Sequence, residues 1–183
     1  QISDTDLLEQ LTDLGLEVDH SKKEKNDLLI KLDLTPNRGD CFSLIGIARD
    51  VCAVNNLKLK LPKFKKQQQN LDSKKTISVD RRACSSYLGQ IIKLKNKGIT
   101  PQYIQKTLKA ADIGQVNPIV DITNYVMLHT GQPLHAFDNK KIGKKIYVKF
   151  PSKRINLKLL DGASHEITKD YLTISDEKKV IAL

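Results

Sequence analysis

The chain has 183 residues, of which 39% are hydrophobic and 28% are charged, and its formal net charge is +10 at pH 7. This composition is ordinary for a soluble globular protein, and no apolar run approaches the roughly 20 residues that a membrane-spanning helix needs. We therefore expect no membrane partner, and no secretory signal is visible. The length suffices for one large domain or two small ones, each with a buried core.

The first part of the chain predicts a small helix–strand–helix domain over residues 1–59. Its first helix begins after Ser3, whose hydroxyl can cap backbone N–H groups, and ends before Gly15. Between them, apolar residues recur at helical spacing: Leu7, Leu8, Leu11 and Leu14.

A polar loop over residues 21–27 is followed by a predicted strand. In this strand apolar residues alternate with polar ones: Leu28, Ile30, Leu32 and Leu34. A turn over 35–40 then leads into a second helix over about 41–54, with Asp40 placed to cap it. Arg38, in the turn, is expected to pair with Asp40 or to cap carbonyl groups; contact with an RNA phosphate is the other interpretation.

Residues 60–75 are rich in Lys and Gln with few apolar anchors, and this composition is typical of a solvated linker. The remainder, residues 76–183, predicts a predominantly β domain with one marked helix, which makes the fold class α+β. The helix begins at Thr100-Pro101, by the pairing of an N-cap with a first-turn proline, and ends before Gly114. Strands are expected at 76–79, 87–92, 146–150, 155–160, 172–174 and 180–183, with a turn at Asp161-Gly162.

The positive charge is compatible with a polyanionic partner such as nucleic acid. Most of the basic residues are lysines scattered through every segment. Lysine attracts phosphates in a salt-sensitive way but lacks the planar fork that arginine uses for specific recognition. Composition alone therefore leaves non-specific binding of nucleic acid open.

The chain contains three cysteines, Cys41, Cys52 and Cys84, at wide spacing. None falls in a Cys-x-x-Cys or Cys/His pattern with metal-ligand spacing, so we expect no metal site. Reduced thiols with structural roles fit this pattern, and they indicate a cytoplasmic protein.

Residues 117–138 are the most informative stretch, because polar side chains interrupt an otherwise apolar pattern. Buried polar groups cost free energy unless they find partners, so these groups satisfy one another or hold a ligand. Asn124 and His135 lie eleven positions apart, on either side of a turn over 130–133, as suits two arms of a loop or hairpin that face one pocket. Spacing alone favours structural roles for both. The polar residues are Asp121, Thr123, Asn124, His129, Gln132, His135 and Asp138.

Two long motifs closely resemble the beta subunit of bacterial phenylalanyl-tRNA synthetase. The first is Leu-Thr-Pro-Asn-Arg-Gly-Asp-Cys-Phe-Ser-Leu-Ile-Gly-Ile-Ala-Arg-Asp over 34–50. The second combines Val-Asp-Ile-Thr-Asn-Tyr-Val over 120–126 with Gly-Gln-Pro-Leu-His-Ala-Phe-Asp over 131–138. Supporting matches occur at 15–18, 87–89 and 160–162, so the resemblance covers essentially the whole chain in the right order.

The resemblance implies a first helical domain followed by an editing domain that hydrolyses tyrosine wrongly attached to tRNA(Phe). Positioning roles in the editing pocket fall to Asn124 and His135, and Thr123 and Pro133 are expected to contact the substrate. The implied reaction is hydrolysis of the acyl ester by a positioned water. No metal or cofactor is implied for this region. ATP and Mg²⁺ serve aminoacylation by the whole enzyme, and the implied partners are tRNA(Phe) and the alpha subunit.

Three departures from the family are visible. A short polar loop stands between Val18 and Leu28, where the family usually inserts an oligonucleotide-binding barrel. The chain stops before the glycine-rich loop and the glutamate that complete the family's editing pocket. Because it starts at Gln1 and ends in a strand-like run, we expect a piece of a longer polypeptide. Finally, Ser85-Ser86 stands where members of the family often have Pro-Arg.

Two other functions remain open at this point. The chain could be a non-catalytic scaffold that docks tRNA or the partner subunit, or it could be a free-standing aminoacyl-tRNA deacylase.

Overall fold

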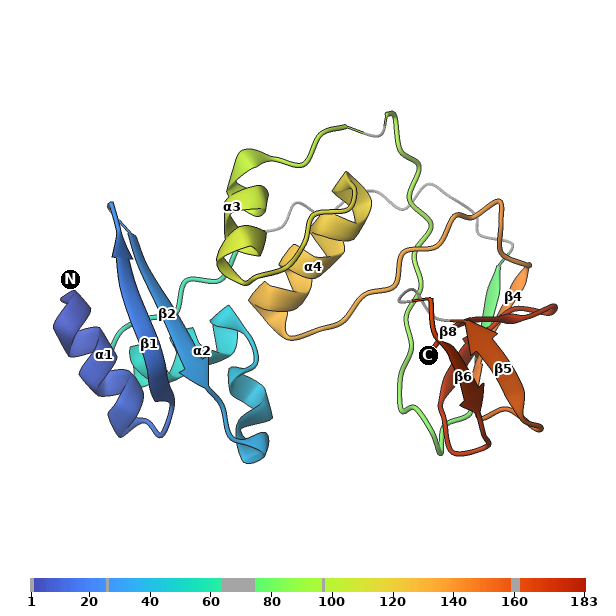
Figure 1. Cartoon of the computed structure of the whole chain (residues 1–183), viewed down its shortest axis with the longest axis horizontal. Coiled ribbons are helices and arrows are strands. Elements are labelled where there is room, and N and C mark those ends of the chain that lie inside the picture. The colour runs from blue at the N-terminus through green and yellow to red at the C-terminus, as the bar shows by residue number, and fades with distance from the viewer. Residues whose placement is uncertain (1, 26, 64–74, 97, 159–161) are drawn as a thin grey trace. The chain divides into compact units, whose positions relative to one another are not determined.

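The computed structural model describes residues 2–25, 27–63, 75–96, 98–158 and 162–183. It contains helices and several small sheets, which confirms the predicted α+β class (Figure 1). The chain divides into two compact units, each built from segments that are distant in the sequence. The first unit comprises Gln1–Lys65 and Asn96–Ala136, and the second comprises Lys66–Lys95 and Phe137–Leu183.

The first helix of the first unit, α1 (Asp4–Asp13), begins where the sequence predicts. The hydroxyl of Ser3 accepts a hydrogen bond from the N–H of Asp6 at 3.1 Å, so one of the unpaired donors of the first turn is satisfied. Three buried side chains form the core beneath α1: Leu11, Leu16 and Cys41.

A β-hairpin follows, made of β1 (Glu17–Glu24) and β2 (Asp27–Asp33), which pair antiparallel. The predicted strand is confirmed as β2, whereas the polar loop predicted over 21–27 is wrong because β1 extends through Glu24. Most side chains of β1 are exposed, so its sequence shows no alternation of apolar residues. The strand forms because its backbone pairs with β2.

A 3₁₀ helix, η1 (Pro36–Cys41), joins β2 to helix α2 (Leu44–Val54). The prediction that Asp40 caps α2 is wrong. Because η1 extends through Cys41, α2 begins later, and the Ser43 hydroxyl takes the capping role by accepting a hydrogen bond from the Gly46 N–H at 3.0 Å.

Two further helices complete the first unit. The predicted helix is confirmed as α3 (Gln102–Ala110), but its N-cap residue is Pro101 and not Thr100, whose hydroxyl bonds elsewhere. Helix α4 (Pro118–Thr130) adds a second helix where the sequence suggested a loop or hairpin. It packs against both α2 and α3.

The second unit contains a four-stranded sheet in the order β3-β4-β7-β8 and a separate hairpin, β5-β6. Strands β3 and β4 are parallel, and the other pairs are antiparallel. The core of the four-stranded sheet is Ile146, Val148 and Ile174. The strands are β3 (Thr76–Val79), β4 (Lys145–Lys149), β5 (Ile155–Lys158), β6 (Ser164–Ile167), β7 (Thr173–Ser175) and β8 (Val180–Ala182).

Most strands of this unit lie where the sequence predicts them. There are two exceptions. Residues 87–92 form no strand, and Tyr87 packs against the sheet core instead. Strand β6, whose first three residues are exposed, was not predicted. Asp161 of the predicted turn and residues 64–74 of the predicted linker lie outside the described residues.

The two units differ from the domains drawn from the sequence. Helices α3 and α4 group with the N-terminal residues, whereas the sequence places them in one domain over 76–183. The boundaries 1–59, 60–75 and 76–183 therefore stay a prediction. Within the described ranges, no helix combines the length and apolar character that crossing a membrane would require.

Candidate functional site

Helix α4 carries most of the polar residues singled out in the sequence. It starts at Asn117, whose side-chain oxygen accepts hydrogen bonds from the N–H groups of Ile119 at 3.0 Å and Val120 at 3.1 Å. It ends at Gly131, which adopts φ of 74°, a left-handed conformation that favours glycine. The signals Asn117-Pro118 and Gly131 mark both ends of the helix and could have revealed it.

Asp121 fixes the first turn of α4. Its side chain is 2% exposed, and its two oxygens accept hydrogen bonds from the Thr100 hydroxyl at 2.5 Å and from the Val116 N–H at 2.9 Å. The hydrogen bond from Thr100 lowers the pKa of Asp121, and the bond from Val116 adds to this shift. The carboxylate thus ties the start of α3 to the start of α4.

The predicted site residues all lie within the first unit. Thr123 and Asn124 are half-buried on α4, two and three residues beyond Asp121. The Thr123 hydroxyl donates to the Val120 carbonyl at 2.7 Å. The side-chain amide of Asn124 has no hydrogen-bond partner among the described residues, which leaves it available to a ligand. Pro133 and His135 are exposed in the segment that follows Gly131.

Two shallow hollows in the described part of the chain lie beside α1, one lined by Leu8 and Val18 and the other by Leu7 and Lys23 among others, and neither contains these residues. The common pocket for Asn124 and His135 therefore stays a prediction.

An aromatic cluster covers one side of the α3–α4 pair. The Tyr103 and Tyr125 rings meet edge to face with centroids 5.6 Å apart, and His129 lies 4.3 Å from Tyr125. Tyr125 and His129 are four positions apart on α4, so they share one face of the helix. Burial raises the pKa of the Tyr125 phenol. The sequence left the role of His129 open, and the structure assigns it to this packing.

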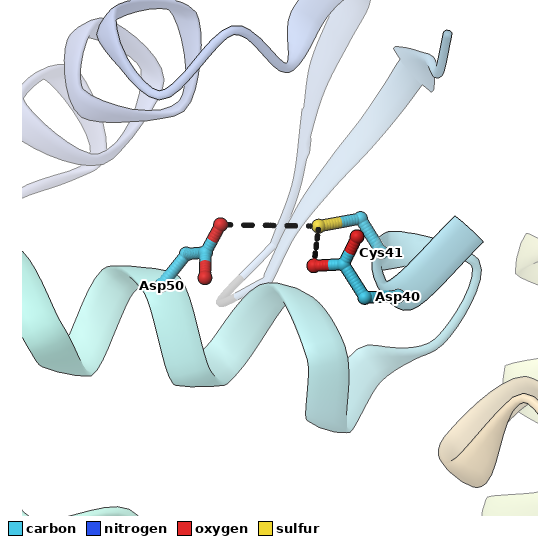
Figure 2. A group of neighbouring side chains, drawn as sticks. All are labelled: Asp40, Cys41 and Asp50. Carbon is cyan, nitrogen blue, oxygen red and sulfur yellow. Dashed lines mark hydrogen bonds between the residues drawn. The ribbon is translucent and has the colours of Figure 1, made fainter. Parts of the chain in front are cut away.

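A second polar group, which the sequence did not predict, lies where η1 meets α2. It consists of Asp40, Cys41 and Asp50, whose ligand atoms lie within 4.8 Å of one another (Figure 2). The thiol of Cys41 lies 3.4 Å from a carboxylate oxygen of Asp40 and 3.9 Å from one of Asp50. Burial raises the pKa of the Cys41 thiol, so it stays protonated at neutral pH.

Arg38 contacts every member of this group. Its Nε and Nη2 atoms donate to the two oxygens of Asp40 at 3.2 and 3.0 Å, and Nη2 also donates to Asp50 and to the Cys41 sulfur. Nη1 donates to the Leu14 carbonyl at 3.2 Å. Both structural roles predicted for Arg38 are therefore confirmed. The guanidinium supplies the positive charge that a metal ion would bring, so the group is an ion-pair network that joins η1, α2 and the end of α1.

This network sets a pH dependence of stability. The Arg38 guanidinium holds the pKa of Asp40 at about 2, below its ordinary value of 3.8. A lowered carboxyl pKa adds stability above the ordinary value, and this stability is lost as the pH falls through the folded-state value. We expect the difference in free energy of unfolding between the wild type and Asp40→Asn to be constant from neutral pH to about 5 and to shrink between about 4 and 2. Urea unfolding at a series of pH values measures it.

The Arg38→Gln background provides the control for this prediction. Without the guanidinium, Asp40→Asn should produce a difference that no longer changes between those pH values. A difference between wild type and Asp40→Asn that persists undiminished at pH 2 would contradict the assignment.

Comparison with known proteins gives a consistent result. The B3/4 domain family matches residues 83–183, which is just over half of the chain. The phenylalanine–tRNA ligase beta subunit of Photorhabdus laumondii is 42% identical over 160 residues, covering 86% of this chain and 20% of the relative. The corresponding subunit of Rhodopirellula baltica is 35% identical over 186 residues, covering 100% of this chain and 27% of the relative. The subunit of Acinetobacter baylyi is 38% identical over 159 residues, covering 86% of this chain and 20% of the relative. The chain thus spans about a fifth to a quarter of the length of these relatives.

Proposed function

The chain belongs to the B3/4 domain family, and on that premise we propose that it forms part of a phenylalanine–tRNA ligase beta subunit and hydrolyses tyrosine wrongly esterified to tRNA(Phe). The observation that carries the proposal is the similarity to such subunits over nearly the whole chain, including the segment that contains Asn124 and His135.

Phenylalanine–tRNA ligases have a physical need for such a reaction. Tyrosine differs from phenylalanine by one hydroxyl, and an apolar pocket rejects an added hydroxyl only about a hundredfold. A second pocket that hydrogen-bonds the phenol selects the wrong amino acid, because phenylalanine would leave its polar groups unpaired. Separate synthesis and hydrolysis sites then multiply their selectivities.

In the proposed site, Asn124 and His135 orient the ester and the attacking water. The amide of Asn124 can both donate and accept hydrogen bonds, and a neutral imidazole at His135 can hold a water or a ribose hydroxyl. Thr123 and Pro133 line the same site. The bond that breaks joins the tyrosyl carbonyl carbon to the ribose oxygen; water supplies the new hydroxyl, and its proton goes to the ribose oxygen.

The whole ligase supplies the remaining functions in this proposal. An alpha subunit is the protein partner, and tRNA(Phe) is the nucleic-acid partner. ATP and Mg²⁺ serve aminoacylation, and the carboxylates of Asp40 and Asp50 do not fit a Mg²⁺ ion because they already face the Arg38 guanidinium. The cysteines are unpaired thiols, which agrees with a reducing cytoplasm.

Direct deacylation tests the proposal. The native protein that carries this sequence is mixed with Tyr-tRNA(Phe) or with Phe-tRNA(Phe), and the loss of each ester is followed over time. We expect the tyrosyl ester to be hydrolysed at least about a hundredfold faster than the phenylalanyl ester, since a site built around a phenol hydroxyl discriminates strongly against its absence.

The other candidate functions are outcomes of the same experiment. Binding of tRNA without hydrolysis of either ester would identify a scaffold and contradict the proposal. Hydrolysis of both esters at one rate would identify an unselective deacylase and contradict it equally. If the 183-residue chain alone hydrolyses the tyrosyl ester as fast as the native protein, it is a self-sufficient deacylase.

A further inference from the structure

Strand β4 shows opposite chemistry on its two faces. Ile146 and Val148 point into the sheet core and are 8% and 1% exposed. The alternate residues Lys145, Tyr147 and Lys149 lie on the other face, because successive side chains of a strand point to opposite sides. We call these three residues the β4 platform.

The Tyr147 ring is flanked by both lysines of the platform. The Nζ of Lys145 lies 5.1 Å from the ring centroid, and the Nζ of Lys149 lies 4.8 Å from it. Both lysines are exposed, and the ring is half-buried. Two ammonium groups are thus gathered at one aromatic surface by cation–π attraction.

Strand β4 has two neighbours, and the platform is open on the β3 edge only. On the β7 edge, Ser175 lies opposite Tyr147 and Thr173 lies opposite Lys149, and both are buried. In the parallel pairing of β3 and β4, Thr76 lies opposite Lys145 and Ser78 lies opposite Tyr147. Both are exposed, and both are small hydroxyl side chains that do not cover an aromatic ring. Their hydroxyl groups can also donate hydrogen bonds to phosphate oxygens.

Charges next to the platform leave it net positive. A carboxylate oxygen of Glu177 accepts a hydrogen bond from the backbone N–H of Lys145 at 2.7 Å, which brings one negative charge near this end. Lys75, the residue before Thr76, adds a third ammonium group, and its Nζ donates to the Ile142 carbonyl at 3.1 Å. Asp176 adds a second carboxylate, which accepts a hydrogen bond from the Gly143 N–H at 3.1 Å. Three lysines against two carboxylates still favour an anionic ligand.

We propose that the β4 platform binds an unpaired stretch of RNA, with one base stacked on Tyr147 and the adjoining phosphates paired with Lys145 and Lys149. Aromatic rings stack on bases of any sequence, and flanking cations follow the backbone. The long lysine stems allow each ammonium group to leave the ring for a phosphate when a base arrives. The inference rests on the proposed function in taking the RNA to be the single-stranded 3′ end of tRNA, which must enter an editing site.

Fluorescence anisotropy with the full chain tests the platform. The probe is a labelled single-stranded RNA of about eight nucleotides that ends in CCA, a length within the range that such surfaces cover. We expect Tyr147→Val to weaken binding about tenfold, because one base loses its stacking partner, and Tyr147→Phe to bind like the wild type. Valine keeps the preference for a strand, and thermal unfolding of both variants verifies the fold.

The lysines have a separate signature in the salt dependence. Converting both Lys145 and Lys149 to Gln should reduce the slope of log affinity against log salt by about 1.4, or about 0.7 for each lost phosphate contact. The matched control converts Lys140 and Lys141, which lie in a turn of the same unit, and should leave the slope unchanged. Tyr171→Val is the control for Tyr147→Val, because it removes a tyrosine ring that is 50% exposed outside the platform, and it should bind the probe like the wild type.

The inference is overturned if Tyr147→Val binds the probe like the wild type, or if the control lysines matter as much as the platform lysines. Competition by an RNA duplex as strong as by the single strand would also overturn it. These outcomes are distinct from failure of the proposed function. If the probe binds in a manner that depends on Tyr147 but the native protein does not hydrolyse Tyr-tRNA(Phe) selectively, only the editing role is contradicted.

Discussion

Replacing His135 by alanine is expected to lower the rate of Tyr-tRNA(Phe) deacylation by the native protein at least about a hundredfold. A group that positions or polarises the reacting water contributes about 10² to 10⁴ in rate. His135 is exposed, so the substitution leaves no cavity, and stability should stay unchanged. Single-turnover deacylation with saturating enzyme measures the effect on the chemical step.

Two companion variants sharpen this result. Asn124→Ala should reduce the same rate, and the two losses should not add fully if both groups hold one water. His20, exposed on β1 in the same unit, offers the matched control, because His20→Ala removes an imidazole without touching the proposed site. Normal deacylation by His135→Ala would refute the assignment of the site.

We expect Gly46→Ala to destabilise the first unit by about 3 kcal/mol, although alanine is the better helix former by about 1 kcal/mol. A Cβ at Gly46 would lie 1.7 Å from the carbonyl oxygen of Asp40 and 2.7 Å from its carbonyl carbon. Both are backbone atoms of η1, so the clash can be relieved only by moving η1 or α2. Urea unfolding followed by far-UV circular dichroism measures the loss.

Gly39→Ala is the control for this prediction. Nothing lies within 4 Å of a Cβ at Gly39, and this residue also belongs to the Pro36–Cys41 helix. Its substitution should therefore change stability by less than about 0.5 kcal/mol. Equal stability of the Gly46→Ala variant and the wild type would show that η1 and α2 do not approach as described.

Local signals predicted those parts of the fold that local interactions stabilise. Helix α1 follows from Ser3 and its apolar spacing, and β2 follows from alternation, because in each case one face packs on a core. Strand β1 was missed since its side chains are mostly polar and its stability comes from a partner strand. Thr100 was predicted to be a helix N-cap because Pro101 follows it in the sequence. Its actual hydrogen-bond partner, Asp121, lies on another helix, which the local sequence does not reveal.

The candidate site was predictable in composition but not in geometry. The resemblance pointed to Asn124 and His135, and their separation across the turn at 130–133 suggested a loop or hairpin. The segment is rich in β-branched residues, which disfavour a helix when taken alone. Packing of α4 against α2 and α3, with the Asn117 cap and the Asp121 hydrogen bonds, outweighs that preference.

Strands β3 and β4 are parallel neighbours, yet residues 80–144 separate them in the chain. At the usual speed of translation, about 5 to 20 residues per second, β3 leaves the ribosome on the order of 3 to 13 s before its partner exists. Throughout that interval Ile77 and Val79 have no sheet to join, and only the emergence of β4 closes this long loop. Premature termination anywhere in that interval would release a chain whose strand β3 has no partner and leaves Ile77 and Val79 exposed, a natural substrate for chaperones.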